Sequence, residues 1–435
     1  MNQPLWAPDQ QRIDNAWISQ FMAMVNEAFP EAQASDYASL QRWALADTEG
    51  FWAAVWQFCG VVASETGDTV LADGDKFPGA RWFPEARLNF AENLLRYRDD
   101  RTAIISLLEN GDRRELSYAE LYLKVAQLAA SLRAEGVTEG DRVVGFMPNI
   151  AETVVAMLAA TSIGAIWSSC SPDFGFNGVM DRFGQIEPKV LFCADGYYYN
   201  GKTCDSLARI AEIAEQIDSL QRVVVVPLTQ EAPDLAAISG AVLFDDYLDE
   251  GASEVTFAQL PFDHPLYIMY SSGTTGVPKC IVHSAGGTLL QHLKEHQLLV
   301  DLGRGDVFFY FTTCGWMMWN WLVSGLASGA AGVLYDGSPF AREGSLLLDA
   351  IDDEGITVFG TSAKFIAALE KAGIKPAQSH KLDSLKTILS TGSPLSHESF
   401  DYVYRDIKAD LCLSSISGGT DILSCFVGGC GILPV

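Results

Sequence analysis

From about residue 101 onward, short apolar runs alternate with helical stretches, and this alternation restricts the folds open to the chain. Short continuous apolar strands separated by helices are typical of parallel sheets covered by helices. The pattern therefore predicts an α/β fold of layered subdomains with largely parallel sheets. Ligands in such folds sit in the loops beyond the carboxyl ends of the strands. The predicted strands cover 142–147, 190–193, 222–226, 267–271, 307–311, 333–335 and 385–390, and the predicted helices cover 151–163, 288–300, 346–354 and 362–372.

The first hundred residues differ from the rest of the chain in composition and in predicted secondary structure. Residues 1–100 are rich in Trp and Phe and are interpreted as a helical cap, with a buried helix over 51–63. The segment 77–97 mixes turns with a closing amphipathic helix. We expect residues 1–100 to pack as a cap on the main body, 101–435.

Charge and composition exclude several classes of protein. The 435 residues carry a formal charge of −26, which repels phosphate backbones and anionic lipid. No apolar stretch reaches the roughly 18–20 residues that a membrane span needs, and the start lacks the features of a signal peptide. The nine cysteines show no metal-ligand spacing. These features predict a cytoplasmic protein with small-molecule partners, no nucleic acid and no membrane insertion.

One loop carries a strong chemical signal. The string YSSGTTGVPK covers residues 270–279 and follows the predicted strand 267–271. Its glycines let the backbone approach a polyphosphate, its hydroxyls and N–H groups can donate hydrogen bonds, and Lys279 adds a positive charge. No GK[ST] closes the loop, so a P-loop kinase or ATPase is not predicted. The alternative interpretation, which a shorter string such as SGT alone would favour, is a surface turn rich in Ser, Thr and Gly.

This string resembles the phosphate-binding motif of the adenylate-forming superfamily. Thr391–Leu395 (TGSPL) resembles the turn against adenine in that superfamily, and Ser415–Asp421 (SISGGTD) resembles its motif for the α-phosphate and Mg²⁺. The segment 77–97 is similar to the opening of the acetyl-CoA synthetase branch. Segments 312–330 and 414–422 resemble the acetoacetyl-CoA synthetases within that branch. This resemblance extends over essentially the whole chain.

The resemblance implies a role for each matching residue. Those implied for the ATP phosphates are Ser271, Ser272, Gly273, Thr274, Thr275, Gly276 and Lys279. Those implied for adenine and AMP are Gly392, Ser393, Pro394, Ser415, Ile416, Ser417, Gly418, Gly419 and Thr420. Asp421 is implied as the Mg²⁺ residue; many relatives have Glu at this position, so ligation through water is an alternative.

The resemblance also places an acyl pocket and a CoA contact. Trp316, Met317, Met318 and Gly418 are implied to line the pocket, although such a cluster is also typical of plain core. Acetate-specific relatives carry Trp where this chain has Gly418, so the loss of the indole predicts room for a longer acid such as acetoacetate. The alternative is that a neighbouring side chain fills the space.

Two further features keep both interpretations open. Tyr199, Asn200, Gly201 and Lys202 fall where the branch contacts the CoA nucleotide, but a tyrosine-rich turn is equally typical of a packed surface loop. His283 either lines the approach of ATP or is structural.

The resemblance implies ATP-dependent conversion of acetoacetate to its adenylate and then to acetoacetyl-CoA, with AMP and pyrophosphate released. ATP, CoA and Mg²⁺ are the implied substrates and cofactor. Propionate, butyrate or a branched short acid is an alternative substrate, and a non-catalytic nucleotide-binding remnant is an alternative of another class. The chain stops shortly after Asp421, so we expect the lysine-bearing C-terminal domain of the family to be absent and the 1–435 chain to turn over poorly.

Overall fold

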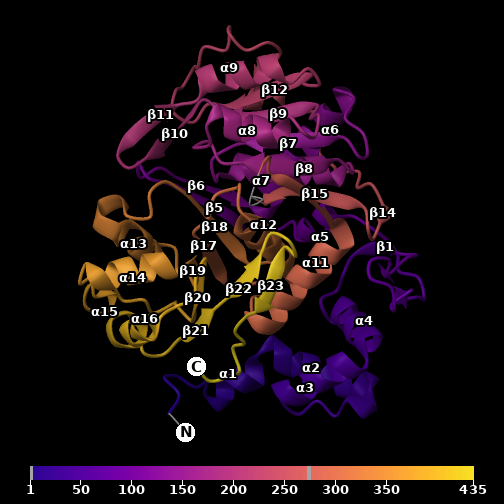
Figure 1. Ribbon diagram of the computed structural model, residues 1–435, viewed down its shortest axis with the longest axis vertical. Coiled ribbons are helices and arrows are strands. Elements are labelled where there is room, and N and C mark those ends of the chain that lie inside the picture. The colour runs from indigo at the N-terminus through magenta and orange to yellow at the C-terminus, as the bar shows by residue number, and fades with distance from the viewer. Residues whose placement is uncertain (1–2, 272–275) are drawn as a thin grey trace.

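Two seven-stranded sheets form the framework of the protein (Figure 1). This computed structural model describes residues 3–271 and 276–435. The first sheet contains, in spatial order, β13 (Ala241–Leu243), β12 (Arg222–Val226), β9 (Val190–Ala194), β7 (Arg142–Phe146), β8 (Ile166–Cys170), β15 (Pro265–Ser271) and β16 (Lys279–Ser284). The second contains β21 (Cys412–Ser415), β20 (Thr387–Thr391), β19 (Val358–Ser362), β17 (Val307–Tyr310), β18 (Ala331–Asp336), β5 (Thr102–Leu108) and β6 (Arg113–Ser117).

Neighbouring strands in both sheets are parallel, except that β16 and β6 run antiparallel at one edge of each sheet. The predicted α/β class with largely parallel sheets is confirmed. Each predicted strand is present with its ends moved by at most a few residues. Apolar runs locate such strands well because both of their faces are covered.

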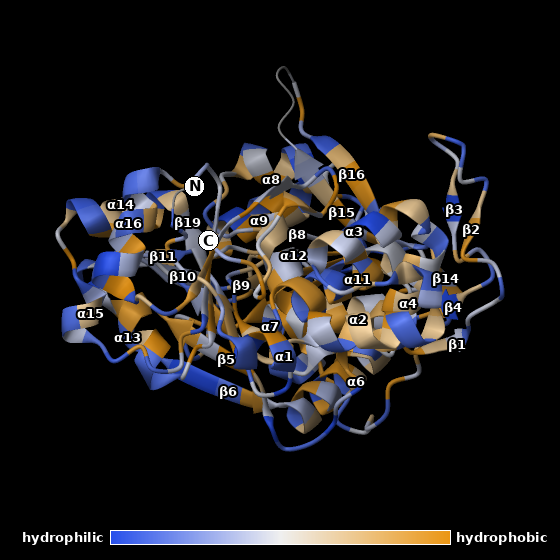
Figure 2. Cartoon of the chain, turned by 90° about the horizontal axis from the view of Figure 1, so that it is seen from below, coloured by the Kyte–Doolittle hydropathy of each residue, from blue (hydrophilic) through white to orange (hydrophobic). Residues whose placement is uncertain are grey.

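Helices α6 (Tyr118–Ala134) and α7 (Ala151–Ser162) lie between the two sheets. Every residue of α7 except Glu152 is buried, because sheets pack on both sides of it. Figure 2 shows hydrophobic residues gathered around α7 and hydrophilic residues on β6 and α15 (Pro376–Ser379) at the outside. The outer faces of the sheets are covered by α8 (Phe176–Phe183), α9 (Leu207–Gln216), α13 (Ser345–Asp353), α14 (Ala363–Lys371) and α16 (His397–Tyr402).

The first hundred residues contain helices and short strands. The helices are α1 (Gln10–Asn15), α2 (Trp17–Ala28), α3 (Tyr37–Ala46), α4 (Thr48–Phe58) and α5 (Phe90–Leu94), and the strands are β1 (Ala63–Glu65), β2 (Leu71–Ala72), β3 (Arg81–Trp82) and β4 (Arg87–Leu88). The pattern did not predict these strands. Strand β14 (Leu260–Pro261) from the body pairs with β4, so the two segments share one small sheet.

The helix predicted over 51–63 is wrong at both ends, because α4 covers Thr48–Phe58. Asp47 caps its first turn by accepting a hydrogen bond from the Gly50 N–H at 2.9 Å. At the other end Gly60 has φ +61°, and the Val61 N–H donates back to the Trp56 carbonyl. A left-handed glycine ends a helix in this way, whatever the apolar pattern beyond it.

A wide helical turn replaces the end of the helix predicted over 288–300. Helix α11 covers Ala285–Leu293, and Lys294–Leu299 continue it as a π-helix. Such wide turns are frequent at functional sites.

Within the described ranges, no helix has the length and apolarity that crossing a bilayer requires.

Asn89 fastens the cap to the body. Its side chain is fully buried, and its Nδ2 donates to the carbonyls of Thr161, Ser162 and Ala258 at 2.9–3.2 Å. Its Oδ1 accepts from the Glu92 N–H and so caps α5.

We expect Asn89→Ala to lower the free energy of unfolding by about 2–3 kcal/mol, because three buried carbonyls lose their donor. Urea unfolding measures this loss, and Asn15→Ala, at an exposed asparagine, is the control; equal effects of the two changes would contradict the role.

Candidate functional site

A cavity of about 720 Å³ lies at the carboxyl ends of four neighbouring parallel strands. Its wall includes Tyr310 at the end of β17, Ser362 at the end of β19, Thr391 at the end of β20 and Ser415 at the end of β21. Parallel strands bring their carboxyl ends to one edge, so the loops that follow them meet there.

The turn Gly392–Pro394 follows β20 and borders the cavity. Gly392 has φ +88°, which a side chain disfavours. The turn is tied to the next strand, because the Thr391 hydroxyl donates to the Ile416 carbonyl at 3.0 Å and the Ile416 N–H donates to Ser390. Residues 415–420 therefore lie beside the turn, and all of them line the cavity.

A two-stranded ribbon covers one side of the cavity. It consists of β22 (Ser417–Gly419) and β23 (Ser424–Val427), and Gly418 pairs with Cys425. A Cβ on Gly418 would lie 2.2 Å from the Ser424 carbonyl oxygen. Gly418 lines the cavity, but the direction its side chain would take is filled by the backbone of β23.

Trp316, Met317 and Met318 line the same cavity from the start of α12 (Met317–Ser324). Trp316 is 63% exposed, whereas the two methionines are half-buried. Trp321 lies one turn further along α12, on the same face as Met317, and also borders the cavity.

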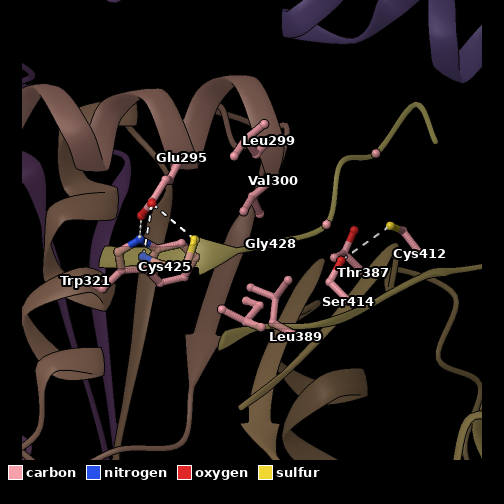
Figure 3. Close-up of a pocket in the computed structure, with 13 residues that line it drawn as sticks. Glu295, Leu299, Val300, Trp321, Thr387, Leu389, Cys412, Ser414, Cys425 and Gly428 are labelled. Carbon is pink, nitrogen blue, oxygen red and sulfur yellow. Dashed lines mark hydrogen bonds between the residues drawn. The ribbon is translucent and has the colours of Figure 1, made fainter. Parts of the chain in front are cut away.

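A buried carboxylate lies at this end of the cavity. Glu295 is in the π-helical turn and accepts hydrogen bonds from Trp321 Nε1 at 2.8 Å and Cys425 Sγ at 3.2 Å (Figure 3). It also accepts a hydrogen bond from Ser424 Oγ at 2.6 Å. Burial acts to raise the pKa of this carboxyl, but the Lys294 ammonium and the hydrogen bonds from Ser424 and Cys425 outweigh burial and hold the pKa below its usual value. The group is therefore an anion at neutral pH.

Two histidines hold the turn between β22 and β23. His283 donates from Nε2 to the Thr420 carbonyl at 2.7 Å, and His292 donates from Nε2 to the Leu423 carbonyl at 2.7 Å. Both Nε2 atoms carry the proton, since a carbonyl only accepts. Thr420 and Asp421 sit in this turn, so His283 has a structural contact with the predicted phosphate segment.

The predicted phosphate loop is only partly described. Ser271 ends β15, Gly276 has φ +105°, and the exposed Lys279 begins β16 opposite Ser271. Ser272, Gly273, Thr274 and Thr275 lie outside the described residues. Lys279 and the exposed Asp421 are not part of the cavity wall.

The predicted CoA segment is a hairpin of β10 (Gly196–Tyr199) and β11 (Lys202–Asp205). The N–H groups of Asn200 and Gly201 at its turn donate to the carboxylate of Glu109, which also accepts from the Ser338 N–H at 2.6 Å. These N–H groups are therefore occupied, whereas the side chains of Tyr199 and Lys202 are exposed.

Sequence reasoning missed several residues of the cavity. Tyr310 and Thr312 could have been found, since they lie at or just after the end of the predicted strand 307–311, whereas Thr361 and Ser362 end β19, a strand that the sequence did not predict. Glu295 gives no signal in the sequence because it lies within a helical stretch.

Three histidines near the cavity predict how stability depends on pH. Burial lowers the pKa of His283 and His292 below 6.5, and lowers that of His296 to about 3. The unfolded chain then binds protons that the folded chain does not. The contribution of these neutral histidines to the free energy of unfolding is therefore fully present above pH 6.5, and it is lost as the pH falls toward their pKa values in the folded protein.

We expect the free energy of unfolding to fall below pH 6.5 by about 1.4 kcal/mol per pH unit for each of the buried His292 and His296. Urea unfolding at about pH 7.5 and about pH 5.5 measures this. His397→Gln, at an exposed histidine, should leave the slope unchanged. Equal stability at the two pH values would contradict the burial of neutral histidines.

Two family models match the chain. Residues 90–413 match the AMP-binding enzyme family, and residues 37–94 match the acetyl-coenzyme A synthetase N-terminus. A solved acetoacetyl-CoA synthetase from Streptomyces lividans has a TM-score of 0.94 and 45% identity, covering 100% of this chain and 67% of that one.

The chain is also similar to curated proteins. It is 51% identical to the acetoacetyl-coenzyme A synthetase of Rhizobium meliloti (strain 1021), over 99% of this chain and 66% of that protein. It is 48% identical to the acetoacetyl-CoA synthetase of Mus musculus, over 100% and 65%. A malonamoyl-CoA synthetase of Penicillium aethiopicum is 40% identical, over 97% and 62%. The chain thus spans about two thirds of the length of these relatives.

Proposed function

Because this chain belongs to the AMP-binding enzyme family, we propose that it binds ATP and activates a short 3-oxo acid, acetoacetate, as its adenylate on the way to acetoacetyl-CoA. The observation that carries the proposal is the single cavity that joins the turn Gly392–Pro394, the segment 415–420 and the wall Trp316–Met318. An adenine ring, a phosphate and an acyl group need to meet in one space for this reaction.

The names of the relatives narrow the choice of the acid that we propose as the substrate. Acetoacetate and malonamate share a carboxylate, one methylene and a carbonyl at C3, and differ only in a methyl or amino group beyond it. A site for that common skeleton fits relatives of both names. Propionate and butyrate lack the C3 oxygen.

The chemistry needs positioning more than proton transfer. A carboxylate oxygen of the acid attacks the α-phosphorus, the bond from that phosphorus to the β-phosphate oxygen breaks, and pyrophosphate leaves with the electron pair. The acid is already ionised at neutral pH, so no general base is required. The CoA thiol then gives up its proton to solvent, its sulfur attacks the acyl carbon, and AMP leaves. We assign the α-phosphate contact to Thr420, and the hydrogen bonds of His283 and His292 to the carbonyls of Thr420 and Leu423 support this by holding its turn.

Mg²⁺ fits the proposal as an ion carried by the nucleotide. Among the described residues, no three His, Cys, Asp or Glu side chains gather as a metal centre. Asp421 is a single exposed carboxylate, so phosphate oxygens and water would supply the other ligands. The ion would neutralise phosphate charge beside a chain of net charge −26.

We assign CoA contacts to Tyr199 and Lys202, whose side chains are exposed on the β10–β11 hairpin. We also propose that residues 1–100 form the cap and residues 101–435 the nucleotide-binding part.

Acid-dependent exchange of labelled pyrophosphate into ATP tests the function. We expect exchange by the 1–435 chain with acetoacetate to exceed exchange with acetate, propionate or butyrate, even if it is slow. Exchange by the protein from an extended reading frame is measured under the same conditions. Absence of exchange with every acid from both proteins would leave a nucleotide-binding remnant, and preference for butyrate would move the substrate to a plain short acid.

Lys279→Ala tests the phosphate loop. Losing a charged hydrogen bond to phosphate should weaken ATP binding by about 1–3 kcal/mol, as measured by titration calorimetry. Lys371→Ala, at an exposed lysine in the last turn of α14, is the matched control. Unchanged affinity in Lys279→Ala would remove this lysine from the site.

A further inference from the structure

Tyr310 carries a hydroxyl that the folded protein leaves without a partner. The side chain is 1% exposed, and among the described residues nothing accepts a hydrogen bond from the hydroxyl or donates one to it. Buried hydroxyls are normally paired, so an unpaired one next to a cavity requires an explanation. Tyr310 lines the 720 Å³ cavity, so a bound ligand can supply the partner.

The backbone directs this side chain toward the cavity side of the second sheet. Tyr310 pairs with Gly360 on the neighbouring strand β19, and a Cβ on Gly360 would lie 2.0 Å from Tyr310 Cδ2. The ring therefore lies over the space that a side chain on Gly360 would take. The preceding residue, Phe309, packs in the core on the opposite face.

Neighbours of Tyr310 place it at the acyl end of the cavity. Its ring meets Trp321 edge to face, with centroids 6.0 Å apart. Trp321 shares a face of α12 with Met317. On the other side, the Cys425 thiol is close enough to help raise the pKa of the Tyr310 hydroxyl, after burial as the main cause. Cys425 pairs with Gly418, which also lines the cavity.

The other potential donors at this end are occupied. Trp321 Nε1, Ser424 Oγ and Cys425 Sγ all donate to Glu295. A ligand oxygen placed there would be repelled by the Glu295 carboxylate unless a donor faced it. Among the described buried side chains at this end, Tyr310 has a hydroxyl without a hydrogen-bond partner.

We propose that the Tyr310 hydroxyl donates a hydrogen bond to the C3 carbonyl oxygen of the bound acid and so selects 3-oxo acids over plain acids of the same length. This inference rests on the proposed function. In this arrangement the acid's carboxylate faces Thr420 and its C3 oxygen faces Tyr310, both of which line the cavity, and the Glu295 anion disfavours acids that end in a second carboxylate.

Thr361 is the competing residue. Its hydroxyl is also buried and unpartnered among the described residues, and it lines the same cavity. It pairs with Ser390, and the next residue pairs with Thr391, directly before the turn Gly392–Pro394. Thr361 therefore lies toward the proposed adenine end, and Tyr310 lies toward the acyl end.

The test compares two stable mimics of the acyl-adenylate, acetoacetyl- and butyryl-sulfamoyl adenosine, which differ in the C3 oxygen. Calorimetry with the 1–435 chain measures their affinities without requiring turnover. We expect Tyr310→Phe to lower the preference for the acetoacetyl mimic by about 10- to 100-fold while leaving the affinity for the butyryl mimic nearly unchanged. Its melting temperature should stay equal or rise, because an unpaired hydroxyl has been removed.

Matched variants separate the outcomes. Tyr335→Phe removes another buried tyrosine hydroxyl, which donates to the Ser338 carbonyl at 2.8 Å away from the cavity wall, and should keep the preference. If Tyr310→Phe keeps the wild-type preference, or if Thr361→Val loses it instead, the assignment to Tyr310 is overturned. If the wild-type chain binds neither mimic, the proposed function itself fails and the inference fails with it.

Discussion

The shared direction of four strands determines where the large cavity of this protein lies. Strands β17, β19, β20 and β21 are parallel neighbours, so their last residues and the loops after them meet along one edge of the second sheet. The buried helix α7 holds the first sheet against the second, and the ribbon β22–β23 covers one side of the edge. Segments separated by more than a hundred residues in sequence become the wall of one cavity in this way.

Polar groups give this apolar framework its chemical character. Glu295 collects the indole of Trp321, the hydroxyl of Ser424 and the thiol of Cys425, and it fixes α12 and β23 relative to each other. His283 and His292 fix the turn that follows β22. A buried network of this kind is rigid when each member is satisfied, and the uncommitted hydroxyl of Tyr310 contrasts with it.

The sequence predicted the fold class and seven of the fourteen strands in the two large sheets, because two covered faces require continuous apolar runs. The turn 392–394 and the segment 415–420 were predicted from their resemblance to superfamily motifs, and only the strand before the first of them, 385–390, was also predicted from the apolar pattern. The sequence could not show that the N–H groups of Asn200 and Gly201 are bound by Glu109, a contact across ninety residues of chain. It also mistook 59–63 for helix, because apolar periodicity does not reveal the left-handed turn at Gly60. Glu295 was invisible for a similar reason, since only the packing of α11, α12 and β23 makes its position special.

The close approach of Gly418 to β23 bears on how pockets of different depth could interconvert during evolution. A tryptophan at this position would collide with the Ser424 carbonyl before its ring reached the acyl space. Any side chain at position 418 therefore requires the ribbon β22–β23 to move. Because Ser424 and Cys425 on β23 donate to Glu295, such a movement would also disturb the hydrogen bonds that hold this buried carboxylate.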